Sequence, residues 1–342
     1  MDDKKSIRRR SFIHSSVAIT AGLPAISKAR AEENADVQGT DGIDGNSIPC
    51  GMIGNVKVSR LILGSNLLIG GAHPRDLVYV RKLMGRYNSK ERILKVLKLA
   101  ESVGINTVLM SSASPALIRK YNTEYGGHMQ QIRRLDVWED DTDETIKRKL
   151  DDLIREEIPL IYVFGCSGDL LVRDGRIDMI EKTLNLAKEA GVVCGVGGHS
   201  LSVVTGCEKQ GLQPAFYVKT FHHDQYWSAT PKENRKDFCW YSPDGNSTRS
   251  GVQPDHNEYH ENIWCLEPEE TSEVMKKVKV PWIAFKVLAA GAISPTDGFK
   301  YVLQNGADFM AVGMLDFQVE EDAAIVKGLF ARGIKRDRPW MG

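Results

Sequence analysis

Half of the eight histidines in this 342-residue chain fall within one long polar segment, residues 222–267. His222 begins this segment, and His256 and His260 lie four residues apart near its far end. Two histidines at that spacing share one face of a helix, as two ligands of one metal ion must. Neutral imidazoles suit zinc, manganese or iron. The sequence therefore predicts a divalent metal held by His222, His256 and His260, with solvent-facing or hydrogen-bonded structural histidines as the alternative.

A fifth histidine, His199, follows the paired glycines Gly197 and Gly198. Glycines at such a place let a ligand approach the backbone closely. The ordinary pKa of imidazole lies near neutrality, so histidine can donate or accept a proton at physiological pH. We expect His199 and His222 to act as metal ligands or as a general acid and base.

Two lysines, Lys219 and Lys286, lie in runs of residues typical of buried strands. A buried lysine needs a partner or a lowered pKa. If its side chain points inward, it can bind a phosphate or carboxylate, or form a Schiff base. The alternative is an outward side chain whose ammonium group reaches solvent. Carboxylates that follow other predicted strands, which carry less weight because charged residues are common in loops, are Glu139, Asp140 and Asp169.

These residues are placed by a repeated pattern of short β-branched runs and longer amphipathic stretches. Eight such units predict a (β/α)8 TIM barrel, with an open doubly wound sheet as the alternative. In such barrels the chemistry sits at the C-terminal ends of the strands. The predicted strands cover residues 59–65, 106–111, 132–138, 159–165, 192–198, 214–221, 282–289 and 308–313.

Composition excludes several classes of protein. The 45 basic residues balance the 45 acidic residues, so no net charge draws the chain to nucleic acid. The six cysteines form no CxxC pair, so their spacing indicates neither a zinc ribbon nor a redox dithiol. We interpret Cys166 and Cys194 as small apolar residues of the core.

The first 31 residues have the order of an export signal: basic, then apolar, then small. The run Arg9, Arg10, Ser11 and Phe12 resembles a twin-arginine leader, with cleavage expected after Ala31. The apolar part is short and is interrupted by glycine and proline, so no stable membrane span is expected. The partner implied is the twin-arginine export machinery, and the expected location is periplasmic or extracellular. The alternative is a disordered basic tail that stays inside.

The rest of the chain divides into two parts. Residues 32–48 are rich in Gly, Asp, Asn and Glu and are expected to form a flexible linker. Residues 49–342 are expected to form the barrel, with residues 222–267 as a long loop over one end.

Several short stretches occur in an order that resembles the aldo/keto reductases. They lie at residues 54–61, 63–64, 70–71, 104–108, 145–153, 158–163, 195–198, 283–285 and 289–291. The likeness covers most of residues 51–293 and implies the (β/α)8 barrel of that family.

The residues that the family uses for catalysis are not where the resemblance places them. Aldo/keto reductases use an aspartate, tyrosine, lysine and histidine beside a nicotinamide. Leu109 stands at the aspartate position, and residues 110–114 hold no tyrosine. Residues 138–140 hold no lysine, and residues 164–166 hold no histidine. The resemblance therefore implies the fold without the usual reduction.

The last two units, residues 289–293 and 306–314, are similar to the seventh and eighth strands of phosphate-binding barrels. There, glycines such as Gly291 and Gly313 let backbone N–H groups approach a phosphate. This similarity keeps NAD(P) open as a cofactor. The alternative is that both glycines only permit tight turns.

We interpret the chain as an exported enzyme that acts on a small polar substrate of carbohydrate type. Tryptophan and tyrosine in the long loop can stack on sugar faces, while histidines handle protons or metal. The expected chemistry is metal-assisted or acid/base-assisted isomerase, lyase or hydrolase chemistry. The alternatives are a divergent NAD(P)-linked oxidoreductase and a barrel that binds a ligand without catalysis.

Overall fold

The computed structural model describes residues 47–342 except 73–76, 78, 111–114 and 236–261. The predicted leader, nearly all of the predicted linker, and the candidate metal ligands His256 and His260 lie outside the described residues.

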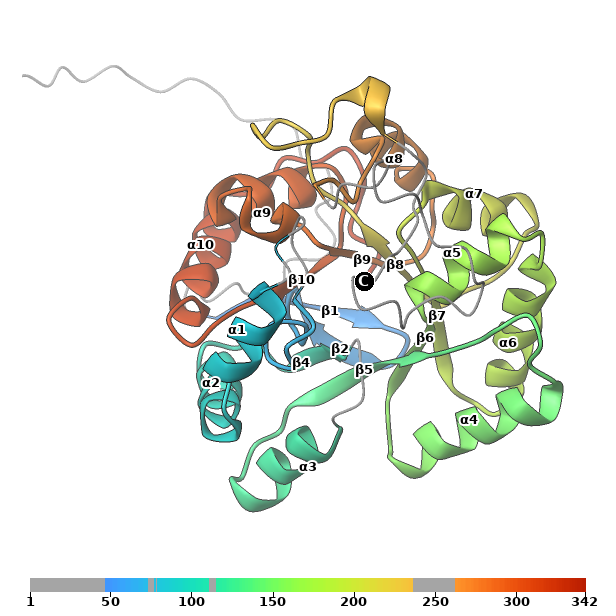
Figure 1. The fold of residues 1–342 in the computed structure, drawn as a ribbon, viewed down its shortest axis with the longest axis horizontal. Coiled ribbons are helices and arrows are strands. Elements are labelled where there is room, and N and C mark those ends of the chain that lie inside the picture. Colours follow the sequence, from blue (N-terminus) through green and yellow to red (C-terminus); the bar gives the residue numbers. More distant parts are fainter. Residues whose placement is uncertain (1–46, 73–76, 78, 111–114, 236–261) are drawn as a thin grey trace, which may run out of the picture. The chain divides into compact units, whose positions relative to one another are not determined.

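Eight parallel strands close into a barrel, which confirms the predicted (β/α)8 fold and excludes the open sheet (Figure 1). Each strand pairs with the next along the chain, and the last closes on the first through a register that joins Met310 to Leu61 and Gly313 to Gly64. Every predicted strand range overlaps an observed strand. The strands are β3 (Leu61–Gly64), β4 (Thr107–Met110), β5 (Gln130–Leu135), β6 (Leu160–Val163), β7 (Val193–Gly198), β8 (Tyr217–Thr220), β9 (Trp282–Phe285) and β10 (Phe309–Gly313).

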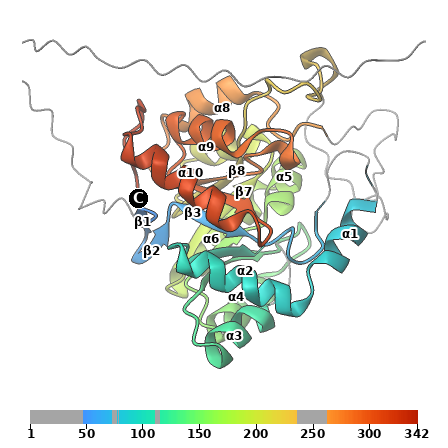
Figure 2. The ribbon, with the colours of Figure 1, turned by 90° about the vertical axis from the view of Figure 1, so that its left-hand side faces the viewer.

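Helices surround the barrel, as Figures 1 and 2 show from two directions. Thr142 caps α4 by accepting a hydrogen bond from the Thr145 N–H, and this helix buries its apolar stripe against the barrel. The helices are α1 (Tyr79–Tyr87), α2 (Lys90–Ser102), α3 (Pro115–Glu124), α4 (Asp143–Arg155), α5 (Gly165–Arg173), α6 (Ile177–Glu189), α7 (Leu201–Lys209), α8 (Pro268–Met275), α9 (Pro295–Gln304) and α10 (Val319–Ala331).

An antiparallel hairpin, β1 (Cys50–Ile53) and β2 (Val56–Ser59), precedes the barrel. It turns at Gly54, whose φ of 59° is in the left-handed region that glycine tolerates. Ile53 and Val58 pack with the apolar residues inside the barrel. The hairpin therefore seals one end of the barrel, and the opposite end, where the strands terminate, remains for a site.

Side-chain alternation along each strand separates two apolar cores. One fills the barrel and includes Ile132, Leu160 and Val218, whereas the other lies between barrel and helices and includes Tyr217 and Trp282. A residue's place in this alternation decides whether its side chain can reach the barrel interior.

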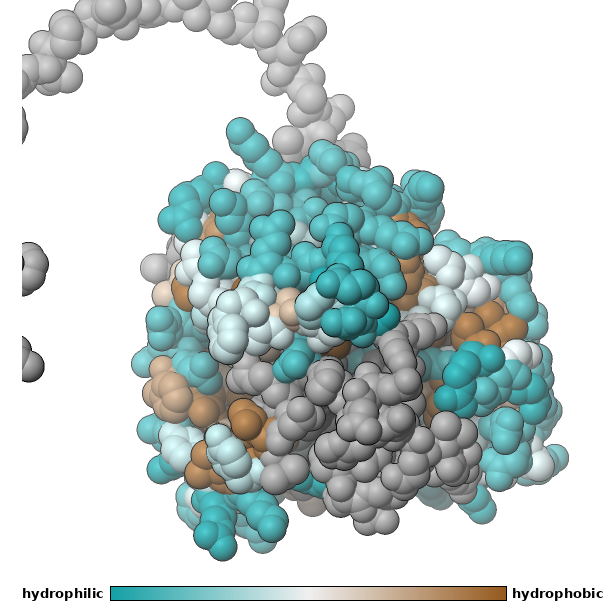
Figure 3. All heavy atoms as spheres, turned by 45° about the horizontal axis from the view of Figure 1, so that its top comes forward, coloured by the Kyte–Doolittle hydropathy of each residue, from teal (hydrophilic) through white to brown (hydrophobic). Residues whose placement is uncertain are grey.

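Within the described part of the chain, no helix has the length and apolar character needed to cross a bilayer. The face drawn in Figure 3 carries mostly hydrophilic residues, with hydrophobic side chains in small separate groups.

Candidate functional site

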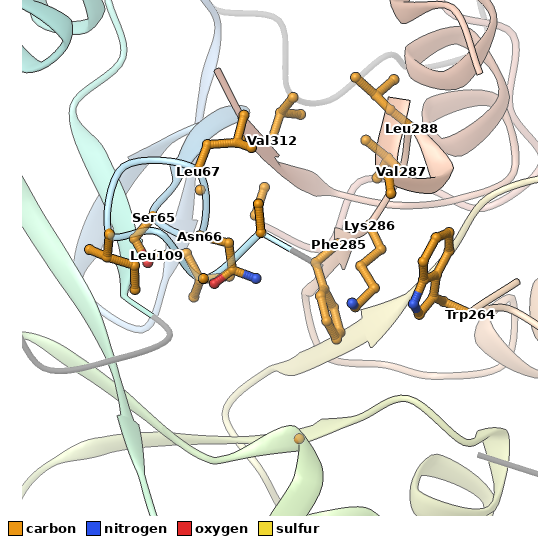
Figure 4. Close-up of a pocket in the computed structure, with 18 of the residues that line it drawn as sticks. Ser65, Asn66, Leu67, Leu109, Trp264, Phe285, Lys286, Val287, Leu288 and Val312 are labelled. Atoms are coloured by element: carbon orange, nitrogen blue, oxygen red, sulfur yellow. The ribbon is translucent and has the colours of Figure 1, made fainter. Parts of the chain in front are cut away.

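A cavity of about 600 Å³ opens where the barrel strands end. We call it the mouth pocket. All eight barrel strands, or the residues just after them, contribute to its lining, from Gly64 of β3 to Gly313 of β10. Figure 4 shows part of this lining, including Asn66, Trp264 and Lys286. This is the end at which barrel enzymes carry their chemistry.

His199 lies just after β7, lines the mouth pocket and is held by Asp169 of α5. Its Nδ1 atom is 2.7 Å from Oδ2 of Asp169, and both side chains are almost fully buried. The same carboxylate accepts hydrogen bonds from the backbone N–H groups of His199 and Ser200 at 2.8 and 2.9 Å. We therefore assign the ring proton to Nδ1, which leaves Nε2 as the basic nitrogen.

Burial lowers the pKa of His199, although Asp169 acts in the opposite direction. The neutral imidazole is then the dominant form at neutral pH, as a general base requires. The proposed acid/base role of His199 stays a prediction, and its geometry suits that role. The sequence gives Asp169 little weight because charged residues are common in loops, and its contact with a histidine 30 positions later is not visible in any local pattern.

Glycines bring α5 close enough for this contact. A Cβ atom on Gly168 would lie 2.2 Å from the carbonyl oxygen of Gly197, so any larger residue would force α5 away from β7. A Cβ atom on Gly165 would lie 3.2 Å from Cε1 of His199. The predicted pair also lies close to helices, because a Cβ atom on Gly197 would lie 3.0 Å from the backbone nitrogen of Gly165 and one on Gly198 would lie 2.7 Å from the side chain of Val203.

Lys286 follows β9 directly and lines the mouth pocket. By strand alternation it should share the outer face with Trp282 and Ala284. Its φ of 57° breaks the alternation, and left-handed backbone is unfavourable for a residue with a Cβ atom. The side chain instead extends between Phe285 and Trp264 (Figure 4). Its Nζ lies 5.2 Å from the centre of the Trp264 ring.

This placement changes the chemistry of the amine. Burial lowers the pKa of Lys286 to about 7, and Cys166 acts in the opposite direction. A substantial fraction of the amine is therefore neutral and nucleophilic at neutral pH.

The second candidate lysine lies elsewhere. Lys219 of β8 is buried on the outer face, where Nζ donates hydrogen bonds to the carbonyl and hydroxyl oxygens of Thr220, both at 2.9 Å. Its neighbour Val218 lines the mouth pocket and Lys219 does not. The structure thus brings Lys286 to the pocket with His199 and keeps Lys219 outside its lining.

His222 lies after β8, fully buried, with backbone groups at both ring nitrogens. Nδ1 is 2.8 Å from the carbonyl oxygen of His223, and Nε2 accepts from the N–H groups of Trp264 and Cys265 at 3.2 and 3.1 Å. Burial lowers the pKa of His222 to about 3. The ring therefore ties both ends of the long loop together.

The metal site stays a prediction. Among the described residues, no group of three or more histidines, cysteines, aspartates or glutamates could hold a metal ion. His222 already uses both ring nitrogens, and the other two proposed ligands, His256 and His260, lie outside the described residues.

Gly291 and Gly313 both line the mouth pocket, close to the start of α10. The first turn of that helix carries Glu320, Glu321 and Asp322, which oppose the attraction of its N-terminus for a phosphate. The nucleotide site proposed here also stays a prediction.

This chain is similar to known proteins at the level of structure alone. No protein-family model matches this chain, and no curated protein matches its sequence. A protein assigned as an aldo-keto reductase from Pseudomonas aeruginosa is 15% identical, with a TM-score of 0.51 over 83% of this chain and 97% of that chain. The structural neighbours of the present chain therefore include an aldo-keto reductase-like TIM barrel.

Two further structures cover the chain to a similar extent. The apo form of Gox0644 is 11% identical over 86% of this chain and 97% of that chain, with a TM-score of 0.47. A truncated 3-deoxy-D-arabino-heptulosonate 7-phosphate synthase from Thermotoga maritima is 10% identical over 85% and 95%, with a TM-score of 0.42. At such identities, likeness concerns the fold alone.

Proposed function

We propose that this barrel is a lyase that forms a Schiff base between Lys286 and a small carbonyl compound of carbohydrate type. The observation that carries the proposal is the position of Lys286. A strained backbone directs its amine into the mouth pocket beside Trp264 and Phe285. His199 lines the same pocket. Backbone strain is often retained where the chemistry of a site requires it.

In the first step, the neutral amine of Lys286 attacks the carbonyl carbon. A new C–N bond forms, the carbonyl oxygen leaves as water, and one proton is taken up overall to give a protonated imine. The low pKa of the amine favours the attack because the nucleophile need not first be deprotonated by solvent.

In the second step, His199 takes the proton of a hydroxyl group on the second carbon from the imine carbon, and the bond that breaks joins this carbon to the carbon next to the imine. The hydroxyl oxygen becomes a carbonyl, and the electron pair moves to the imine nitrogen, giving an enamine. Proton return to the enamine carbon and hydrolysis of the imine release the second product and restore Lys286. Asp169 holds the imidazole in the tautomer that this base requires.

A reductase mechanism fits the lining less well. Leu109 of β4 lines the mouth pocket and stands at the position where the resemblance expects the catalytic aspartate of the family. We therefore propose that the usual reduction is not retained. Trp264 offers an aromatic face against which a polyhydroxylated chain can stack.

Borohydride trapping tests the proposal. The purified protein is mixed with pyruvate, hydroxyacetone, dihydroxyacetone or glyceraldehyde, reduced, digested and analysed by mass spectrometry. We expect a reduced adduct on the peptide that contains Lys286 and none in Lys286→Met. Lys300→Met removes an exposed lysine of α9 and should trap as the wild type does. Absence of an adduct at Lys286 with all four compounds would remove the proposal.

We propose further that the protein is exported through the twin-arginine route. The support is the run Arg9, Arg10, Ser11 and Phe12 ahead of an apolar stretch. Cell fractionation of the full chain should find it outside the cytoplasm, and Arg9→Lys together with Arg10→Lys should retain it inside. Equal export of both forms would contradict the proposal.

A further inference from the structure

The described lining of the mouth pocket is basic. It includes Arg81, Arg134 and Lys286, and none of its described residues is an aspartate or a glutamate. The chain as a whole has equal numbers of acidic and basic residues, so the excess of basic residues is a local feature of the mouth pocket. A cleft lined by one sign of charge raises the local concentration of ligands of the opposite sign.

Arg134 reaches the pocket because of its place in β5. Ile132, two residues earlier, packs inside the barrel, and alternation puts Arg134 on the same face. Its neighbour Arg133 lies on the other face, where Nη1 is 3.2 Å from the carboxylate of Glu156 in the loop after α4. The two adjacent arginines therefore face different surroundings.

Two contacts fix the orientation of the Arg134 guanidinium. Its central carbon lies 4.1 Å from the centre of the Phe164 ring, and its Nε donates to Oδ2 of Asp136 at 3.1 Å. A planar guanidinium held in this way offers a carboxylate a fixed set of donors.

Tyr162 of β6 stands directly beside Arg134, because the register of the two strands pairs these residues. Its side chain packs inside the barrel, lines the mouth pocket and is only 4% exposed. Burial raises the pKa of this phenol, so it keeps its proton and can donate it to an anion.

Cys166, at the start of α5, relates this pair to Lys286. Burial raises the pKa of its thiol, and the positive charges of both Lys286 and Arg134 act against that increase. Both cations therefore lie within electrostatic reach of one sulfur atom in the pocket lining. Arg134 and Lys286 also line the same cavity, so an anionic group held by Arg134 and a carbonyl attacked by Lys286 can belong to one small molecule.

We propose that Arg134 and Tyr162 form a carboxylate subsite and that the substrate is a small 2-oxo acid or an aldol product of one. The carboxylate accepts hydrogen bonds from the guanidinium and from the phenol, and the adjacent carbonyl faces Lys286. The identity of the reaction rests on the proposed function, whereas the carboxylate subsite can be tested without it.

Lactate is the probe that separates the two ideas, because it carries the carboxylate of a 2-oxo acid but has no carbonyl to form a Schiff base. Binding to the full chain is followed by calorimetry, with propane-1,2-diol as the neutral analogue. We expect the wild type to bind lactate and to bind the diol at least ten times more weakly. Arg134→Gln should weaken lactate binding about tenfold or more, and Tyr162→Phe several-fold.

Arg133→Gln is the matched control, since it removes the neighbouring arginine on the outer face and should bind lactate as the wild type does. Lactate affinity unchanged in both Arg134→Gln and Tyr162→Phe would overturn the subsite. The subsite would also be overturned if inorganic phosphate bound more tightly than lactate and its binding depended on Arg134 and Tyr162. If Arg134→Gln does not fold, Tyr162→Phe decides alone, because it removes one oxygen and keeps the ring.

Trapping with borohydride then connects the subsite to the chemistry. Arg134→Gln should raise the concentration of pyruvate that gives half-maximal trapping about tenfold and leave that of hydroxyacetone unchanged. An equal change for both compounds would contradict a carboxylate subsite. Lactate binding that depends on Arg134, with no trapping of any carbonyl, would support the subsite and reject the Schiff-base function.

Discussion

The carboxylate of Asp169 binds both the ring of His199 and the backbone that carries it. Its Oδ2 atom lies 2.7 Å from Nδ1, and its Oδ1 atom accepts hydrogen bonds from the backbone N–H groups of His199 and Ser200. One side chain of α5 thereby fixes the position, orientation and tautomer of the candidate base.

Replacing this carboxylate by an amide should separate proton transfer from Schiff-base formation. In Asp169→Asn the ring loses its charged acceptor, and the wrong tautomer becomes accessible. We expect trapping at Lys286 to persist. Deuterium incorporation in heavy water, at the carbon beside the trapped carbonyl, should slow about 100-fold or more. Asp174→Asn, which removes an exposed carboxylate at the end of the same helix, should leave the rate of deuterium incorporation unchanged. Equal losses of this rate in both variants would contradict the positioning of His199 by Asp169.

The reactivity of Lys286 should depend on pH in a way that an ordinary lysine does not show. Burial lowers the pKa of its amine to about 7, so the neutral form increases as pH rises through 7 and is nearly complete by about pH 8. Acetylation by an N-hydroxysuccinimide ester, followed peptide by peptide, should reach its plateau there. Exposed Lys300 in the same sample is the reference. A Lys286 rate that keeps rising toward pH 10 would show an unperturbed amine.

His222 should contribute to stability in a pH-dependent way. Its folded pKa of about 3 lies below the ordinary value of 6.5, so the unfolded chain binds more protons between those values. Its contribution is present above pH 6.5 and is lost as the pH falls toward 3. His222→Gln should cost about 1–3 kcal/mol of unfolding free energy at pH 7, because two buried N–H groups lose their acceptor.

That difference should shrink by at most about 2 kcal/mol at pH 5, as urea unfolding at the two pH values would show. His128→Gln, at an exposed position, is the control and should change neither value appreciably. A constant difference at both pH values would mean that the ring is protonated in the folded state.

Gly168→Ala should damage the site through its scaffold. The added methyl group would overlap the carbonyl oxygen of Gly197 and push α5 from β7. We expect a loss of about 1–3 kcal/mol in unfolding free energy, together with slower proton exchange because Asp169 moves away from His199. Gly328→Ala in α10 meets only ordinary contacts and should be neutral or slightly stabilising. If Gly168→Ala kept the wild-type free energy of unfolding and the wild-type rate of proton exchange, the backbone would have adapted to the added methyl group.

The sequence predicted the scaffold better than the site, for physical reasons. Strand and helix periods are local, so the eight barrel strands and the stripe of α4 could be derived from neighbouring residues. The partner of His199 could not, because Asp169 meets it only after two units of the barrel have packed together. Arg134 and Tyr162 carry no motif that marks them as site residues, although alternation from Ile132 and Leu160 is enough to place both inside the barrel.

The two lysines show the limit of such reasoning. Alternation places Lys219 on the outer face, where the structure also has it. The same rule would place Lys286 there as well, and only a left-handed residue at the end of β9 reverses its direction. The role of His222 depends on a closing contact with residues more than 40 positions away, which no local pattern contains.

Because the backbone at Lys286 is left-handed, the residue that would be most stable at this position is not the residue that the proposed chemistry needs. Glycine there would relieve a conformational cost of about 1–2 kcal/mol and remove the amine altogether. Laboratory selection for heat resistance alone should therefore replace this lysine early, and selection for turnover should restore it.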